Sequence, residues 1–270
     1  MNTLELIRSR RSVRTFDGRA LSEEDREKIL IYARKTENPY DIPMEWYMLS
    51  QERHHLSTPV IVGADTYIAG KISRIPHAEE AFGYTFEKVV LYAQSMGIGS
   101  TWIAGTMDRG AFERAVSLKD GEVMPCVSPL GYPAGKMSLR ETMMRKGIKA
   151  DKRLPFEQLF FKGTFATPIA EADAGDYHDL LEMVRWSPSA VNKQPWRIVI
   201  DGRNVHFFEK KSGGYDENGW DIQKIDMGIA LSHFILGLEE KQRTAEFVIE
   251  PPQIALPQDT VYTATLILSE

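Results

Sequence analysis

The stretch SPSAVNKQPW, residues 187–196, is the most particular segment of this 270-residue sequence. Two prolines restrict its backbone, and short polar side chains stand between them. Such a loop holds its amides and side chains rigidly outward, as binding of a heteroaromatic ligand with several hydrogen-bonding edges requires. The alternative is a helix exit and turn before a strand, with Trp196 in the core. The pattern is too long and too specific for a turn alone, so we expect a binding loop.

Helices and strands alternate on both sides of this loop. Apolar spacing predicts helices, the first with Ser22 as its N-cap, over residues 21–34, 79–96, 108–116, 176–186 and 225–243. Short apolar runs predict strands over residues 46–50, 58–65, 196–201, 204–210 and 260–268, and residues 122–133 predict a strand that runs into a turn at residues 131–133. Residues 134–153 are basic and poorly patterned, so we expect an extended connection there. The order predicts an α+β fold, a mixed sheet flanked by helices.

The two halves of the sequence repeat the same order of elements. The segments that end at Trp46 and Trp196 match at a shift of 150 residues, and the later helices align Gly83 with Gly228. Two unrelated helix–strand units are the alternative. We expect a duplication, with repeats at residues 1–163 and 164–270 that pack on each other as an internal pseudo-dimer, since each alone would leave an apolar helix face uncovered.

Composition and charge exclude several classes of function. The net charge is −5, from 33 Lys and Arg against 38 Asp and Glu, so we expect no nucleic-acid partner. The single cysteine, Cys126, allows no intrachain disulfide, and the six scattered histidines predict no metal site. No secretory signal and no run of 18 apolar residues is present, so we expect a cytoplasmic protein with no membrane partner.

A basic cluster follows the first few residues of the chain. The run RRSVR, residues 10–14, places three guanidinium groups and one hydroxyl within five positions. Arginine gives forked, charge-assisted hydrogen bonds that suit phosphate oxygens. The alternative is a solvated basic helix end, which is the better interpretation of this motif taken alone.

Two further motifs are weak when taken singly. GIGSTWIAG, residues 97–105, resembles a dinucleotide fingerprint at its start, but Trp102 stands where the third glycine belongs and a helix precedes it. We therefore reject a Rossmann NAD site, and a helix end followed by a buried Trp is the simpler interpretation. The pair Lys152 and Arg153 adds cations after the basic connection, where a solvated linker is the alternative.

Together these motifs resemble the nitroreductase superfamily of FMN-dependent NAD(P)H oxidoreductases. Its signature comprises an RRSxRxF arm, a PSxxNxQPW loop, a GxGxxW segment and a late basic pair. The resemblance implies an FMN-dependent nitroreductase-like fold in which the flavin carries the hydride, so no catalytic side chain is implied. The cofactor-binding residues that it implies are Arg10, Arg11, Ser12, Arg14, Trp102, Ile103, Ala104, Gly105, Arg153, Pro188, Ser189, Ala190, Asn192 and Gln194.

The resemblance also assigns roles to most of these residues. The arm residues Arg10, Ser12 and Arg14, with Arg153, would hold the phosphate and the pyrimidine edge. Pro188, Ser189, Ala190 and Asn192 would cover the ring or hydrogen-bond to it. The backbone at Ala104 and Gly105 would approach the N5–O4 edge.

The arrangement departs from the usual family member. In the first half, ENPYDIPMEW (residues 37–46) occupies the place of the ring-binding loop, and the second half lacks the arginine arm and the basic pair. One chain therefore supplies one complete set of motifs. The sequence resembles the branch of the superfamily in which both halves of the dimer are fused, so we expect one flavin per chain and a monomer that suffices, with further dimerisation open.

The implied activity is hydride transfer from NAD(P)H through FMN to a nitroaromatic, a quinone or a similar small acceptor, by a ping-pong scheme. Two enzymatic alternatives are reduced-flavin chemistry with oxygen, including fragmentation of the flavin, and reductive dehalogenation. A third alternative, of another class, is a non-catalytic FMN store or sensor.

Overall fold

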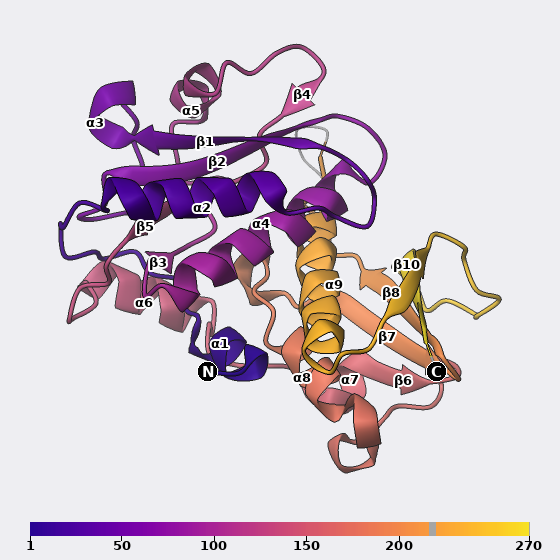
Figure 1. Ribbon diagram of the computed structural model, residues 1–270. Helices are drawn as coiled ribbons and strands as arrows, with labels where there is room; N and C mark the ends of the chain where they lie inside the picture. The colour runs from indigo at the N-terminus through magenta and orange to yellow at the C-terminus, as the bar shows by residue number, and fades with distance from the viewer. Residues whose placement is uncertain (216–219, 270) are drawn as a thin grey trace. The chain divides into compact units, whose positions relative to one another are not determined.

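Each of two parts of the chain folds around its own five-stranded sheet (Figure 1). The computed structural model describes residues 1–215 and 220–269. We call residues 9–150 the arm unit and residues 1–8 with 151–270 the loop unit. Both contain helices and strands, so the α+β prediction is confirmed. The proposed repeat boundary at 163/164 concerns sequence duplication, which these packing units do not test, and it stays a prediction.

The arm unit carries an antiparallel sheet in the order β1-β2-β5-β3, with β4 also paired to β2. Its elements are α2 (Glu23–Lys35), β1 (Met44–Ser50), α3 (Gln51–His54), β2 (Thr66–Ser73), α4 (Ala78–Ser95), β3 (Gly99–Ser100), α5 (Arg109–Ala115), β4 (Glu122–Val123), β5 (Val127–Gly131) and α6 (Leu139–Gly147). Helix α2 begins as expected, because the Ser22 hydroxyl accepts a hydrogen bond from the Asp25 amide.

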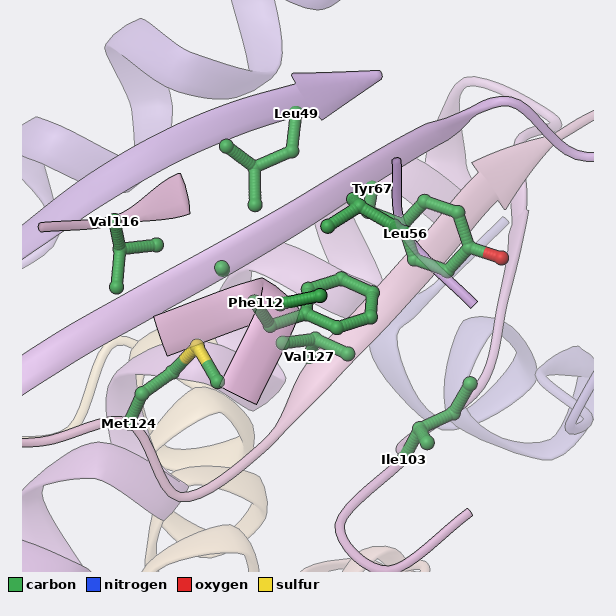
Figure 2. Packing of buried hydrophobic residues seen from close by; sticks show 10 residues of the cluster. Leu49, Leu56, Tyr67, Ile103, Phe112, Val116, Met124 and Val127 are labelled. Atoms are coloured by element: carbon green, nitrogen blue, oxygen red, sulfur yellow. The ribbon is translucent and has the colours of Figure 1, made fainter. Parts of the chain in front are cut away.

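The two faces of this sheet pack against different helices. On one face Trp46 stacks on Phe82 and Phe86 of α4, and Gly70 leaves room for the indole, since a Cβ there would lie 2.9 Å from it. On the other face Tyr67 meets Phe112 of α5 edge to face, within a cluster of buried apolar side chains (Figure 2). Burial on both faces fixes the position of β2 at the centre of the unit.

The loop unit carries a mixed sheet in the order β6-β7-β8-β10-β9, in which only the β6–β7 pair is parallel. Its elements are α1 (Thr3–Ser9), α7 (Phe156–Leu159), β6 (Phe160–Lys162), α8 (His178–Arg185), β7 (Trp196–Asp201), β8 (Asn204–Lys210), α9 (Ile222–Glu240), β9 (Ala245–Val248) and β10 (Thr260–Leu268). Three 3-10 turns, Glu171–Asp173, Gly175–Tyr177 and Ala190–Asn192, complete it.

Helices α8 and α9 form the helical layer of the loop unit. They approach closely at Gly237, where a Cβ would lie 2.6 Å from Leu180. Phe234 of α9 packs edge to face on Phe207 of β8, so α9 lies against the sheet. Helix α1 joins this unit through Arg8, whose guanidinium donates to Glu182 of α8 at 2.7 Å.

The two sheets share one strand order. In the arm unit a helix precedes β1, β1 pairs with β2, and after α4 the chain returns beside β2 as β5. In the loop unit α8 precedes β7, β7 pairs with β8, and after α9 the chain returns beside β8 as β10. All four of these pairings are antiparallel.

Two expectations for the arm unit are wrong. Residues 58–65 form turns with a single bridge at Val62, and the strand is the following segment, β2. Residues 134–153 are not an extended connection, because they contain α6. Ser138 caps this helix by accepting from the amide of Glu141, in a Ser-x-x-Glu pattern typical of helix starts.

Residues 1–215 and 220–269 lack two features. None of the helices there combines the length and the apolar character that crossing a membrane requires. No three His, Cys, Asp or Glu side chains in these ranges gather closely enough to hold a metal ion.

Candidate functional site

The arginine arm lies beside the GIGSTWIAG segment within the arm unit. The Val13 amide donates to the carbonyl of Ser100 at 2.9 Å, and Ser12 forms a parallel bridge with Ser100. Gly99 allows this contact, since a Cβ there would lie 2.9 Å from Val13. Two motifs that are more than 80 residues apart in the sequence are therefore adjacent in the structure.

Glu87 of α4 joins the arm to Trp102. Its carboxylate is fully buried, accepts a hydrogen bond from the Trp102 indole at 2.9 Å, and lies 3.7 Å from Nε of Arg10. The Arg10 side chain is only 6% exposed. Glu87 thus sets the positions of two predicted site residues, although nothing in the sequence marked it.

Glu141 of α6 anchors the rest of the arm. This carboxylate, only 1% exposed, accepts hydrogen bonds from the Thr15 hydroxyl, the Arg14 amide and the Arg11 guanidinium. Helix α6, which lies where we expected an extended connection, therefore holds the arm in place. The Arg11 side chain forms an ion pair with Glu141.

Two guanidinium groups of the arm are buried without complete hydrogen bonding. Nε and Nη1 of Arg10 and Nη1 of Arg14 are buried and have no hydrogen-bond partner within the described residues. Burial lowers the pKa of Arg10, which Glu87 opposes and the charge of Arg145 reinforces. Burial also lowers the pKa of Arg14, opposed by Glu141. Buried donors with no acceptor are costly, so these atoms fit a polyanionic ligand such as a phosphate.

The GIGSTWIAG segment offers further unsatisfied groups. The hydroxyls of Ser100 and Thr101 are buried with no hydrogen-bond partner in the part of the chain that the structure describes. Ile103 pairs with Val127 across a bridge. In the described ranges, the amides of Ala104 and Gly105 have no acceptor, whereas the Ala104 carbonyl accepts from Arg109. The approach of the Ala104 and Gly105 backbone to a ligand stays a prediction, and the hydroxyls of Ser100 and Thr101 are further polar groups in this segment that lack a partner.

The loop at residues 187–196 has unusual backbone geometry. Val191, Asn192 and Gln194 all have positive φ, at 49°, 58° and 53°. The left-handed conformation is a clear outlier for the β-branched Val191, whose side chain is also exposed at 56%. Strain of this kind gathers at functional sites, where the surrounding structure enforces it.

Hydrogen bonds from inside and outside the loop hold this geometry. The Gln194 side chain is buried, and its carbonyl oxygen accepts from the Leu154 amide at 2.9 Å. The Asn192 side chain donates to the carbonyl of Lys152 at 3.0 Å. The Ser189 hydroxyl accepts from the Gln194 amide at 2.9 Å. The loop and the basic pair are therefore tied together within the loop unit.

Arg153 of the basic pair lies over an aromatic ring. Its guanidinium carbon is 4.6 Å from the centroid of Trp186, immediately before the loop. The predicted site residues thus form two groups. The arm unit holds Arg10, Arg11, Ser12, Arg14, Trp102, Ile103, Ala104 and Gly105, and the loop unit holds Arg153, Pro188, Ser189, Ala190, Asn192 and Gln194.

Comparisons with known proteins agree on one family. The family model described as "Putative TM nitroreductase" matches residues 2–238. A crystal structure of a putative nitroreductase from Thermotoga maritima is similar over 99% of this chain and 94% of its own, with a TM-score of 0.64 and 23% identity. That likeness supports the fold.

Two other relatives are similar over about half of the chain. An Archaeoglobus fulgidus protein named "Putative NADH dehydrogenase/NAD(P)H nitroreductase" is 28% identical over 161 residues, which cover 51% of this chain and 89% of that protein. A Clostridium difficile structure named "FMN-dependent Nitroreductase" covers 52% of this chain and 94% of its own, at 16% identity and a TM-score of 0.42. Since the family model spans nearly the whole length, the chain belongs to the nitroreductase family described as "Putative TM nitroreductase".

Proposed function

We propose that this protein is an FMN-dependent oxidoreductase that transfers hydride from NAD(P)H to a small acceptor such as a quinone or nitroaromatic. The observation that carries the proposal is the set of buried, unsatisfied guanidinium nitrogens on Arg10 and Arg14. A terminal phosphate would supply the acceptors that these donors lack. Membership of the nitroreductase family supports the flavin as the group that bears this phosphate.

The residues of the chain would bind and orient the cofactor. Arg10, Ser12 and Arg14, with Arg153, would hold the phosphate and the pyrimidine edge, and the loop at 187–196 would cover the ring. The amides of Ala104 and Gly105 are suited to donate to a ring edge, because they have no acceptor among the described residues. When bound, FMN supplies the hydride chemistry, so no side chain need act as acid or base.

We further propose that the two units are halves of a fused pseudo-dimer that binds one flavin per chain. The shared strand order β1-β2-β5 and β7-β8-β10 supports a duplication. Only one unit carries an arginine arm and only the other carries the SPSAVNKQPW loop. A monomer should therefore suffice for activity.

Release of the cofactor tests the proposal directly. The purified protein is saturated with FMN, desalted and denatured, and the released flavin is identified by chromatography and counted against protein. We expect one FMN per chain, and recovery of FAD, of no flavin or of two flavins would contradict the respective part of the proposal. Steady anaerobic NAD(P)H oxidation that depends on a quinone or nitroaromatic is expected, and its absence would indicate a store or sensor.

A further inference from the structure

The loop at residues 187–196 holds a conformation that its own sequence disfavours. Three non-glycine residues, Val191, Asn192 and Gln194, are left-handed. Asn tolerates this conformation, whereas Gln194 and the β-branched Val191 are disfavoured in it. Interactions elsewhere in the loop unit must therefore select this conformation over a relaxed one.

The second half of the loop is fixed around Gln194. Its amide donates to the Ser189 hydroxyl, and its side chain accepts from Leu154. Its carbonyl accepts from Arg197, at 3.0 Å. In the first half, the amides of Asn192 and Lys193 close the turn by donating to the carbonyls of Ser189 and Ala190, and the Ala190 amide is held by another group.

Asp226 of α9 is that group. The Ala190 amide donates to both of its carboxylate oxygens, each at 3.1 Å. Asp226 is only 3% exposed and lies in the second turn of α9. Ala190 immediately precedes the left-handed Val191, so this contact fixes the residue at which the chain enters the strained turn.

The surroundings of Asp226 make the contact costly. Burial raises the pKa of its carboxyl well above the ordinary value, the Ala190 amide lowers it, and the carboxylates of Asp221 and Glu209 raise it further. The ammonium group of Lys211 lies 3.8 Å from the carboxylate of Asp221, so this cation pairs with Asp221 and not with Asp226. A buried carboxyl that faces two other acids does not improve the core, and such local conflicts are expected where function requires them.

We propose that Asp226 is the positioning residue of the cofactor-binding loop: it holds the Ala190 amide and so presents the left-handed turn at Val191 and Asn192 in the form that receives the flavin ring. The part of this proposal that concerns flavin binding rests on the proposed function. The part in which Asp226 selects the loop conformation does not depend on it.

Substitutions at Asp226 separate acceptor from charge. Asp226→Asn keeps an oxygen that can accept from Ala190, whereas Asp226→Ala removes it. Asp201→Ala is the matched control, because Asp201 is an exposed carboxylate in the same unit. In the flavin-free protein, we expect amide hydrogen exchange at Ala190, Asn192 and Lys193 to quicken roughly tenfold in Asp226→Ala and to stay near wild type in the other two variants.

Flavin affinity is the second measurement. Fluorescence quenching should show the Kd for FMN raised roughly tenfold in Asp226→Ala and changed by less than about threefold in Asp226→Asn and Asp201→Ala. Unchanged loop exchange in Asp226→Ala would overturn the proposal, as would loosening that extends equally to β7, β8 and α8. Loosened exchange with an unchanged Kd would refute the role in receiving the ring. If wild-type protein binds no FMN, the proposed function fails while the exchange data still decide the role of Asp226.

Discussion

Two loops at corresponding places in the two units differ in how their backbones are held. Residues 37–46 connect α2 to β1, and residues 187–196 connect α8 to β7. Both end in a buried tryptophan, Trp46 and Trp196. At the shift of 150 residues, Asp41 corresponds to Val191, and both are left-handed, with φ of 53° and 49°.

The first loop is satisfied by its own side chain. Asn38 is 9% exposed; its amide group donates to the Ile42 carbonyl, and its oxygen accepts from the amides of Tyr40 and Ile42. The second loop depends on groups outside it, Asp226 and Leu154. The two loops therefore hold a left-handed residue at the same position in different ways: the first through its own Asn38, and the second with the help of Asp226 and Leu154, as the ligand-binding role that we propose for it requires.

The largest effect is expected at the arginine arm, which lies in the arm unit. Arg10→Ala should weaken FMN binding by about 1.5–3 kcal/mol, or roughly 10- to 150-fold in Kd, because it removes a charge-assisted hydrogen bond in a buried site. Arg19→Ala is the control, since that side chain is 69% exposed and pairs with Asp17. Equal dissociation constants, with both variants folded by circular dichroism, would argue that the arm does not bind phosphate.

The loop at residues 37–46 should contribute to the stability of the protein and not to flavin binding. Asn38→Ala should lower the free energy of unfolding by about 2 kcal/mol, because it strips partners from buried backbone groups. Asn192→Ala, which loses a more exposed bond to Lys152, should cost less than about 1 kcal/mol and should weaken FMN binding. Urea unfolding and flavin titration of both variants check this. If Asn38→Ala weakens FMN binding and Asn192→Ala causes the larger loss of stability, the distinction between the loops is wrong.

Much of the fold was predictable from local patterns. Ser22 as an N-cap, the apolar face of α4 and the strands β7, β8 and β10 are all confirmed. Strand β2 was missed because residues 66–73 include Gly70 and Lys71. Gly70 is required by Trp46, and Lys71 is buried through its ion pair with Glu122. Neither requirement is visible before the strands are paired.

Helix α6 was missed for a different reason. Its apolar residues Leu139 and Met143 are 85% and 73% exposed. The spacing of apolar residues therefore marks the solvent-facing side of this helix and not its buried side. The capping pattern Ser138-x-x-Glu141 was a usable local signal. In the candidate site, the sequence motifs identified the arm and the loop. Glu87, Glu141 and Asp226, which hold residues of these motifs, lie on helices outside the motifs. No sequence spacing reveals those three partners, and the ligand contacts of the site remain predictions.

A third prediction concerns Asp226, which holds the loop at residues 187–196, and the pH dependence of its contribution to stability. Because the pKa of Asp226 is raised on folding, its stabilising contribution is full below the unfolded pKa and is lost as pH rises through the folded value. Asp226→Asn should therefore gain stability relative to wild type as pH rises from 4 to 8, by about 1.4 kcal/mol for each unit of pKa elevation. Thermal unfolding of both proteins across this range measures the gain, and parallel curves would show that Asp226 ionises normally.

The smallest expected effect tests the left-handed turn that the two loops share. Asp and Asn tolerate this conformation, whereas a β-branched residue does not. Val191→Asn should therefore stabilise the flavin-free protein by about 1 kcal/mol, and Asp41→Val should destabilise it by about the same amount. Asp41→Asn is the control and should change stability by less than about 0.5 kcal/mol. The Val191 side chain is 56% exposed, so little packing is lost on its replacement. If Val191 is retained because the exposed side chain covers the ring, Val191→Asn should also raise the Kd for FMN, while Asp41→Val should leave it unchanged. Urea unfolding without flavin and titration with flavin separate the two effects. A loss of stability in Val191→Asn would mean that the two turns, alike in φ, are not alike in strain.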